Sequence, residues 1–110
     1  LTVSKNSTIG EAIRIMNKEG VDQMPVVEGD DFVGSVTTTS IVEKIIYDPT
    51  LKDKTVGEIM DKPMQVVALD STLDVLSSLL NKNNKALLVR DEQEKPHIIT
   101  QHDILRAMTM

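Results

Sequence analysis

The sequence contains no cysteine and no tryptophan, and it has one phenylalanine and one tyrosine. The absence of cysteine excludes a disulfide framework and thiolate chemistry, which is typical of cytoplasmic proteins, and we expect a cytoplasmic location. With so few aromatic rings, the chain lacks the stacking platforms of single-stranded nucleic-acid binders. Its core must therefore be aliphatic, built from isoleucine, leucine, valine and six methionines.

Positive charge and long apolar runs are also scarce. Twelve Lys and Arg against 17 Asp and Glu give a net charge of −5, which disfavours a nucleic-acid surface because such surfaces cluster basic residues. No apolar run approaches the roughly 20 residues that span a bilayer, and no secretory signal is visible. We therefore expect neither nucleic acid nor membrane as a partner. Because the chain opens at Leu1 without a methionine, we interpret it as part of a longer protein.

An internal repeat organises the chain. "STIGEAIRIMNKEG" and "STLDVLSSLLNKNN" share their opening Ser-Thr, their apolar rhythm and an Asn-Lys near the end. Two later pairs of segments match in the same order, so one supersecondary unit is used twice. The aligned positions are Ser7 with Ser71, Met24 with Leu87, and Gly34 with His97.

Each repeat predicts a strand, a helix, two strands and a second helix. In the first repeat, a helix should begin at a Thr8–Glu11 capping box and end at Gly20. Alternating β-branched runs around acidic turns predict hairpins. The further predicted elements are strands 24–27 and 32–37, helix 39–47, strand 65–68, helix 72–82, strands 86–90 and 97–100, and a helix to residue 108.

A three-stranded sheet with two helices cannot bury both of its faces alone. We therefore predict an α/β fold of duplicated β-α-β-β-α units, packed about a pseudo-twofold axis around one core. The predicted domains are a first motif at 1–48, a linker at 49–54, where "YDPTLKDKT" carries Pro49, and a second motif at 55–110 opened by a helical turn in "VGEIM".

These motifs resemble a tandem CBS-domain pair, or Bateman module, over the whole chain. The resemblance rests on the duplication, on "G-x-V-T" at 34–37, on "IITQHD" at 98–103 and on "VGEIM". More narrowly, "LTVSKNSTIGEAIRIMNKEGVDQMPVV" and "KPHIITQHDIL" are similar to the C-terminal regulatory module of cystathionine β-synthase. That resemblance implies an S-adenosylmethionine sensor in cysteine biosynthesis and a catalytic domain with pyridoxal phosphate (PLP) elsewhere in the same chain. CBS pairs commonly expose apolar helical faces, and the last predicted helix of each repeat is too apolar to be wholly solvated, so we predict a homodimer through these helices. Their apolar residues are Ile41, Ile45 and Ile46 in the first repeat and Ile104, Leu105 and Met108 in the second.

Thr100 and Asp103 form the most informative pair for chemistry. They stand three residues apart at a strand-to-helix junction, where free N–H groups favour an anion. A carboxylate there can accept both hydroxyls of a ribose, but Thr-x-x-Asp also reads as a capping box that needs no ligand. The resemblance favours the nucleoside reading. Because the first repeat has Ser40 at the equivalent position, we expect one competent nucleoside site.

The polar start of "GVDQMPVV" is explained by the resemblance, which places it on the opposite wall of that site. The alternative is a solvated loop between Gly20 and Pro25. Val21 stands where some relatives that bind S-adenosylmethionine carry an aromatic residue, so AMP or ATP stays an alternative ligand. The residues assigned to the site are Leu1, Thr2, Val3, Val21, Asp22, Gln23, Met24, Ile99, Thr100, His102 and Asp103.

Catalytic and metal motifs are missing from the sequence. It has no Ser-His-Asp pattern, no glycine-rich phosphate loop and no recognisable Schiff-base lysine. His97 and His102 lack the spacing of metal ligands, so we assign no metal and no catalytic residue. Three functions stay open: an adenosyl-ligand sensor of a PLP enzyme, an adenine-nucleotide sensor of another protein, and a ligand-free dimerisation module.

Overall fold

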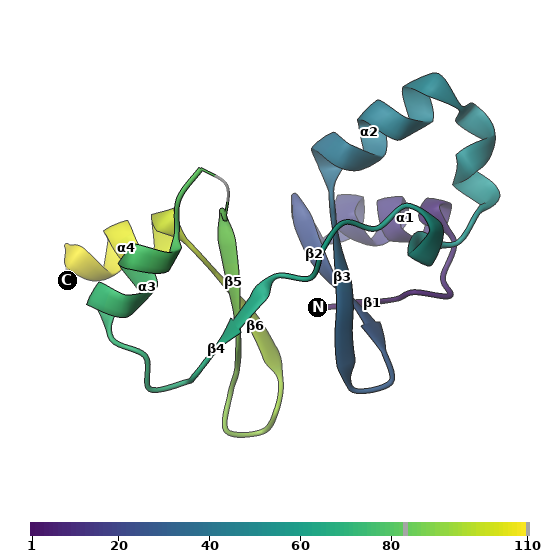
Figure 1. The fold of residues 1–110 in the computed structure, drawn as a ribbon. Coiled ribbons are helices and arrows are strands. Elements are labelled where there is room, and N and C mark those ends of the chain that lie inside the picture. Colours follow the sequence, from purple (N-terminus) through teal and green to yellow (C-terminus); the bar gives the residue numbers. More distant parts are fainter. Residues whose placement is uncertain (83, 110) are drawn as a thin grey trace. The chain divides into compact units, whose positions relative to one another are not determined.

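The computed structural model describes residues 1–82 and 84–109 and divides the chain into two compact units, Leu1–Pro63 and Met64–Met110 (Figure 1). Each unit holds one three-stranded sheet and two α-helices, which confirms the α/β class and the repeated element order. The first unit contains β1 (Val3–Ser4), α1 (Ile9–Glu19), β2 (Gln23–Glu28), β3 (Asp31–Thr37), α2 (Thr38–Tyr47) and the 3₁₀ helices η1 (Pro49–Asp53) and η2 (Val56–Glu58). The second contains β4 (Gln65–Val67), α3 (Leu73–Leu79), β5 (Ala86–Arg90), β6 (Pro96–Thr100) and α4 (Gln101–Met108).

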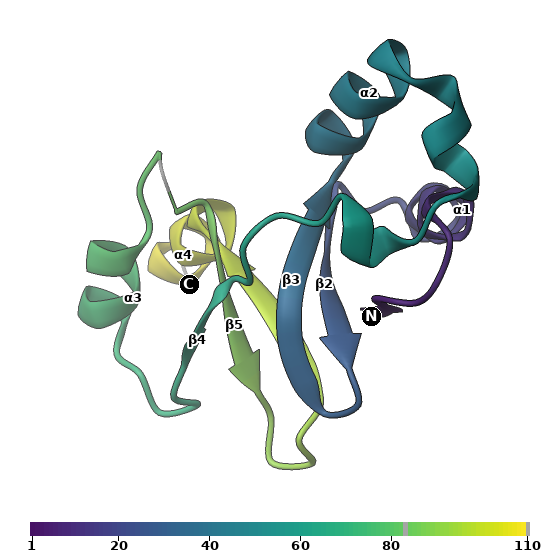
Figure 2. The ribbon, with the colours of Figure 1, turned by 45° about the vertical axis from the view of Figure 1, so that its right-hand side comes forward.

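The sheet of the first unit has the order β1-β2-β3, with β1 parallel and β3 antiparallel to β2. Figure 2 shows β2 and β3 as a long hairpin from whose end α2 departs. Pro25 lies in the central strand, where a proline would normally remove a ladder hydrogen bond. It stands opposite Ser35, whose N–H and C=O both bond Asp61 instead, and β1 pairs with β2 only from Val26 onward. The proline therefore removes no hydrogen bond from this sheet.

Helix α1 begins and ends where the sequence predicts. The Thr8 hydroxyl accepts the Glu11 N–H at 3.1 Å, and Gly20 closes the helix with a φ of 65°, a conformation that favours glycine. Only half of the predicted capping box forms, because the Glu11 carboxylate pairs with Arg14 one turn further along. Ile9, Ala12 and Met16 form the buried face of the helix.

Helix α3 is shorter than the predicted 72–82 and ends after Leu79. Leu80 is already extended, with φ −87° and ψ 124°, and its side chain is buried. The Asn84 side chain donates to the carbonyl of Leu79 at 3.0 Å, which satisfies the end of the helix without a glycine.

The segment between the repeats is folded rather than a plain linker. Within it, η1 begins at Pro49 and is capped by the Asp48 carboxylate, which accepts the Thr50 N–H at 3.1 Å. The "VGEIM" turn is formed by η2, and it packs within the first unit, where Val56 is fully buried. The domain boundaries drawn after residues 48 and 54 follow the repeat, and they stay a prediction.

Most of the buried apolar residues form two clusters, one within each unit, and the single core that we expected stays a prediction. Ile9, Met24, Val26 and Val56 are almost completely buried in the first cluster. Leu87 is fully buried in the second. Among the described residues, no helix combines the length and the apolar character that crossing a membrane requires.

Candidate ligand site

The predicted Thr100–Asp103 pair lies at the junction of β6 and α4. The Thr100 N–H donates to Asp103 Oδ2 at 2.8 Å, and the Thr100 hydroxyl donates to the same oxygen at 3.1 Å. In return, the Thr100 side chain accepts the backbone N–H of Asp103. The capping box weighed as the ligand-free alternative is therefore present, and it fixes the position of the carboxylate.

Asp103 is ionised and partly open to solvent. Arg106, one turn further along α4, donates from Nη2 to Asp103 Oδ1 at 2.7 Å, and the Asp103 side chain remains 38% exposed. The Thr100 N–H, then the Thr100 hydroxyl and Arg106, lower the pKa of Asp103, and partial desolvation opposes them. The junction thus presents a fixed, charged acceptor, the chemistry that hydroxyl groups of a ligand require.

The other two site residues predicted in this unit flank the junction. Ile99 is half-buried at the end of β6 and packs against the second hydrophobic cluster. His102 is exposed in the first turn of α4. Of the two, His102 is the more exposed to solvent.

In the first unit, the polar start of β2 is anchored to α2. Asp22 is exposed, and its carbonyl accepts both the N–H of Thr38, at 2.9 Å, and the Thr38 hydroxyl, at 3.0 Å. Gln23, the first residue of β2, is partly exposed. The stretch that we weighed as a solvated loop is therefore held at two hydrogen bonds by the first residue of α2.

The remaining predicted site residues of this unit differ in how much of them a ligand could meet. The side chains of Val3 and Met24 are buried in the hydrophobic cluster, so only their backbone groups are candidates. Val21 also packs against this cluster and is half-buried. Leu1 is 53% exposed and Thr2 is half-buried, and both precede β1 at the end of the sheet where β2 begins.

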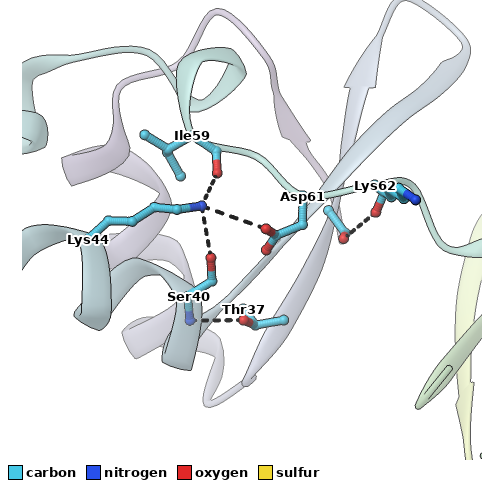
Figure 3. A network of polar contacts seen from close by, with 7 residues as sticks. Thr37, Ser40, Lys44, Ile59, Asp61 and Lys62 are labelled. Carbon is cyan, nitrogen blue, oxygen red and sulfur yellow. Dashed lines mark hydrogen bonds and ion pairs between the residues drawn. The ribbon is translucent and has the colours of Figure 1, made fainter. Parts of the chain in front are cut away.

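The first repeat uses the position equivalent to Asp103 differently (Figure 3). The Ser40 N–H donates to the Thr37 hydroxyl at 3.1 Å, as in the other repeat, but the Ser40 hydroxyl accepts the Lys44 ammonium at 3.1 Å. Lys44 also donates to the Ile59 carbonyl at 2.7 Å and lies 3.6 Å from the Asp61 carboxylate. A lysine network thus stands where the second repeat has an ionised acceptor.

The same network borders a close contact between β3 and the segment after η2. Ser35 exchanges two backbone hydrogen bonds with Asp61, at 3.1 and 2.8 Å, and its hydroxyl donates to the Lys62 carbonyl at 2.7 Å. A Cβ atom on Gly34 would lie 2.5 Å from Met60 Sδ and 2.9 Å from the Asp61 carbonyl oxygen. Position 34 of the "G-x-V-T" motif therefore requires glycine, because Met60 and Asp61 leave no room for a side chain there.

The CBS-domain family model matches residues 1–47 and 56–109. The chain belongs to the CBS-domain family. Its structure confirms the predicted fold of a CBS pair: a CBS-domain protein from Burkholderia ambifaria is 28% identical with a TM-score of 0.80, over 97% of this chain and 80% of that one. A structure of the CBS-pair protein CBSX2 in complex with AMP has a TM-score of 0.75 at 23% identity, over 99% of this chain and 87% of that one.

The curated relatives that are similar to this chain are longer proteins. An inosine-5'-monophosphate dehydrogenase of Methanocaldococcus jannaschii is 33% identical over 96% of this chain, and this chain covers 21% of its length. The cystathionine β-synthase of Oryctolagus cuniculus is 29% identical over 84% of this chain and 17% of its own length. An uncharacterised protein of M. jannaschii, MJ1232, is 28% identical over 98% of this chain and 36% of its own length. The chain thus spans about a sixth to a third of these relatives.

Each unit of the CBS pair carries an apolar groove between its helices. The groove between α1 and α2 has a volume of about 310 Å³, and the groove between α3 and α4 about 190 Å³. Ile46, Leu105 and Met108 border them and are 72%, 59% and 72% exposed. Ile41 and Ile104 at the same grooves are buried, so α2 and α4 are only partly covered by their own units.

Sequence reasoning missed three residues of this arrangement. Arg106 could have been found, because a basic residue three positions after Asp103 lies on the same helix face. Thr38 and Lys44 gave no such signal, since they bond to residues 16 and 15 positions away in the chain. No group of three or more His, Asp or Glu that could hold a metal occurs among residues 1–82 and 84–109.

Proposed function

We propose that this CBS pair is a regulatory sensor that binds one adenosine-containing ligand, with Asp103 as the acceptor of the ribose hydroxyls. The observation that carries the proposal is the ionised, partly exposed Asp103 carboxylate, fixed by Thr100 at the start of α4. The AMP complex of the similar CBSX2 supports the ligand class. Because Ser40 is a hydroxyl already engaged by Lys44, the first repeat supplies no second acceptor of this kind.

The residues of the proposed site would have separate roles. Asp103 holds the ribose, and Thr100 acts by holding Asp103, because its hydroxyl already donates to the carboxylate and accepts from its backbone. Backbone groups near Gln23 and Met24 would contact the adenine, since the Met24 side chain is buried. The exposed Asp22 would face a charged part of the ligand. That both sets serve one ligand is inferred from the family resemblance.

Two adenosyl ligands follow from different observations. S-adenosylmethionine as the ligand is suggested by the similarity to cystathionine β-synthase, since the O. cuniculus enzyme is 29% identical to this chain. Membership of that enzyme family would make the full protein a PLP-dependent lyase of transsulfuration. AMP or ATP follows from the AMP complex of CBSX2, and the similarity to an inosine-5'-monophosphate dehydrogenase offers another catalytic partner domain. In either protein, regulation requires that the ligand binds two conformations with different affinity.

We also propose that the CBS pair forms a homodimer through its helices. Apolar patches that a single unit leaves exposed commonly mark interaction surfaces. Both repeats present such a patch, at Ile46 in α2 and at Leu105 and Met108 in α4. A second copy of the chain offers the same surfaces, so a twofold axis would cover matching patches on both copies.

Calorimetric titration with adenosine, AMP, ATP and S-adenosylmethionine tests the ligand class. Asp103→Ala should weaken binding about 30-fold or more, because charge-assisted hydrogen bonds contribute roughly 1.5–3 kcal/mol each and each 1.4 kcal/mol is about tenfold. Asp103→Asn keeps an oxygen for the Thr100 N–H but loses the charge, so it separates the ligand contact from the helix cap. Ser40→Ala is the matched control and should leave binding unchanged.

Two results would contradict this function. The first is a wild-type chain that binds none of the four ligands at millimolar concentration, which would favour the ligand-free dimerisation module. The second is a loss of binding in Asp103→Ala that Asp103→Asn restores completely, since that pattern assigns the residue to the helix cap alone.

A further inference from the structure

The hydrogen bonds that the Asp103 carboxylate already accepts leave too few free acceptor positions for the two hydroxyls of a ribose. An ionised carboxylate accepts about four hydrogen bonds. Oδ2 already accepts the Thr100 N–H and the Thr100 hydroxyl, at 2.8 and 3.1 Å, and Oδ1 accepts Arg106 Nη2 at 2.7 Å. A pair of ribose hydroxyls requires two acceptor positions. One of the three present donors must therefore leave when such a ligand binds.

Arg106 is the donor that can leave most easily. The Thr100 N–H is fixed by the backbone at the start of α4, and the Thr100 hydroxyl is held from both sides by Asp103. The Arg106 side chain is 67% exposed, and an ion pair at such a surface contributes little net free energy because water replaces it. Once released, the guanidinium stays beside the ligand on the same helix face.

We propose that Arg106 selects the charge of the ligand: it occupies Asp103 in the free protein, yields that carboxylate to the ribose and then pairs with an anionic group of the ligand. The inference rests on the proposed function and names its ligand class, an adenosine ligand that carries phosphate. The planar guanidinium matches phosphate with two parallel hydrogen bonds. A sulfonium at the same place would instead be repelled.

The first repeat shows that this pair is particular to one half of the chain. The position equivalent to Arg106 is Glu43, and the position equivalent to Asp103 is Ser40, so neither partner of the ion pair is repeated. The structure also provides a matched control on α1. Arg14 pairs with Glu11 at the same spacing of three residues and is 65% exposed, but it belongs to no proposed site.

The test compares adenosine, AMP and S-adenosylmethionine in calorimetric titrations of the wild-type chain, Arg106→Gln, Arg106→Lys and Arg14→Gln. In Arg106→Gln, adenosine should bind equally or about 2- to 5-fold tighter, because an ion pair of up to about 1 kcal/mol no longer competes. AMP should bind roughly tenfold weaker, since a charge-assisted hydrogen bond to phosphate is lost. S-adenosylmethionine should gain at least as much as adenosine. Arg106→Lys should keep most of the preference for AMP, and Arg14→Gln should change none of the three affinities.

The outcomes separate this inference from the proposed function. If the wild-type chain binds both ligands and Arg106→Gln leaves the ratio of AMP to adenosine affinity unchanged, the inference is wrong and the adenosine site stands. If Arg106→Gln lowers the affinities for adenosine, AMP and S-adenosylmethionine equally, Arg106 only positions Asp103 and does not distinguish ligands by charge. That result also overturns the inference. A wild-type chain that binds no ligand overturns both proposals.

Discussion

Replacing Gly34 by alanine should loosen the segment that follows η2 and destabilise the first unit. The new methyl group would lie 2.5 Å from Met60 Sδ, 2.8 Å from Met60 Cγ and 2.9 Å from the Asp61 carbonyl oxygen. Met60 can turn its side chain away, because it is unbranched and flexible. The Asp61 carbonyl belongs to the backbone, so the whole segment must move.

The size of the effect follows from the contacts that such a movement breaks. Three hydrogen bonds join Ser35 to Asp61 and Lys62, at 2.7 to 3.1 Å. Each contributes about 1 kcal/mol net, and overpacking without movement costs about 1–3 kcal/mol. Gly34→Ala should therefore lower the free energy of unfolding by about 1–3 kcal/mol, a large share of the roughly 5–15 kcal/mol typical of a domain.

Urea unfolding followed by far-UV circular dichroism measures this change, and hydrogen exchange of the Asp61 amide reports the local opening. His97 occupies the equivalent position in the second repeat, where its side chain is 58% exposed and pairs with Asp91 at 2.9 Å. His97→Ala is therefore the control and should change stability by about 0.5 kcal/mol or less. The double variant Gly34→Ala/Met60→Ala should recover only part of the loss. A Gly34→Ala protein whose free energy of unfolding lies within about 0.5 kcal/mol of wild type would refute the reasoning, because surface substitutions usually have effects of that size.

Two further predictions concern pH and assembly. Because the native contacts lower the pKa of Asp103 below its ordinary value of 3.8, its cap stabilises the fold above that pH and is lost as the pH falls through the native pKa. The stability difference between wild type and Asp103→Asn should therefore shrink between pH 6 and pH 3 in urea titrations, and a constant difference would contradict it. Ile46, 72% exposed, should lie in the dimer interface, so Ile46→Asp should yield monomers in sedimentation velocity at tens of micromolar where wild type is dimeric. A monomeric wild type would exclude this interface.

Local signals predicted most of the fold. The ends of α1 followed from Thr8 and Gly20 because a cap hydroxyl and a glycine with positive φ act within a few residues. The end of α3 did not follow, because the apolar rhythm continues through Leu80 and the helix is ended by a side chain, Asn84, that comes later in the chain. Long-range partners of this kind leave no periodic trace in the sequence.

The packing of "VGEIM" also depends on long-range contacts that the sequence pattern does not reveal. The repeat suggested that this segment opens the second half, but a repeat reports order along the chain and not burial. Val56 and Ile59 are buried in the cluster of the first unit, where the Val56 N–H donates to the Ser7 carbonyl at 2.8 Å. Apolar residues after a linker can fold back onto the preceding unit, and the sequence alone does not distinguish the two directions.

The candidate site was predictable to the extent that it depends on spacing. Thr100 and Asp103 were found because three residues at a strand-to-helix junction bring the two side chains together. Spacing did not reveal that the Met24 side chain would be completely buried, which restricts it to backbone contacts. Nor did it reveal that Lys44 reaches the Ile59 carbonyl and so occupies the equivalent position of the first repeat.

The pairing of Ser35 with Asp61 also bears on how this protein avoids self-association through its backbone. β3 is an edge strand of its sheet, and open edges are templates on which strands of other molecules add and aggregate. The segment after η2 occupies part of that edge with two backbone hydrogen bonds. It therefore acts as a built-in edge protector, and proteolysis near Met60 or a bulky residue at position 34 would expose β3 to aggregation as well as weaken the fold.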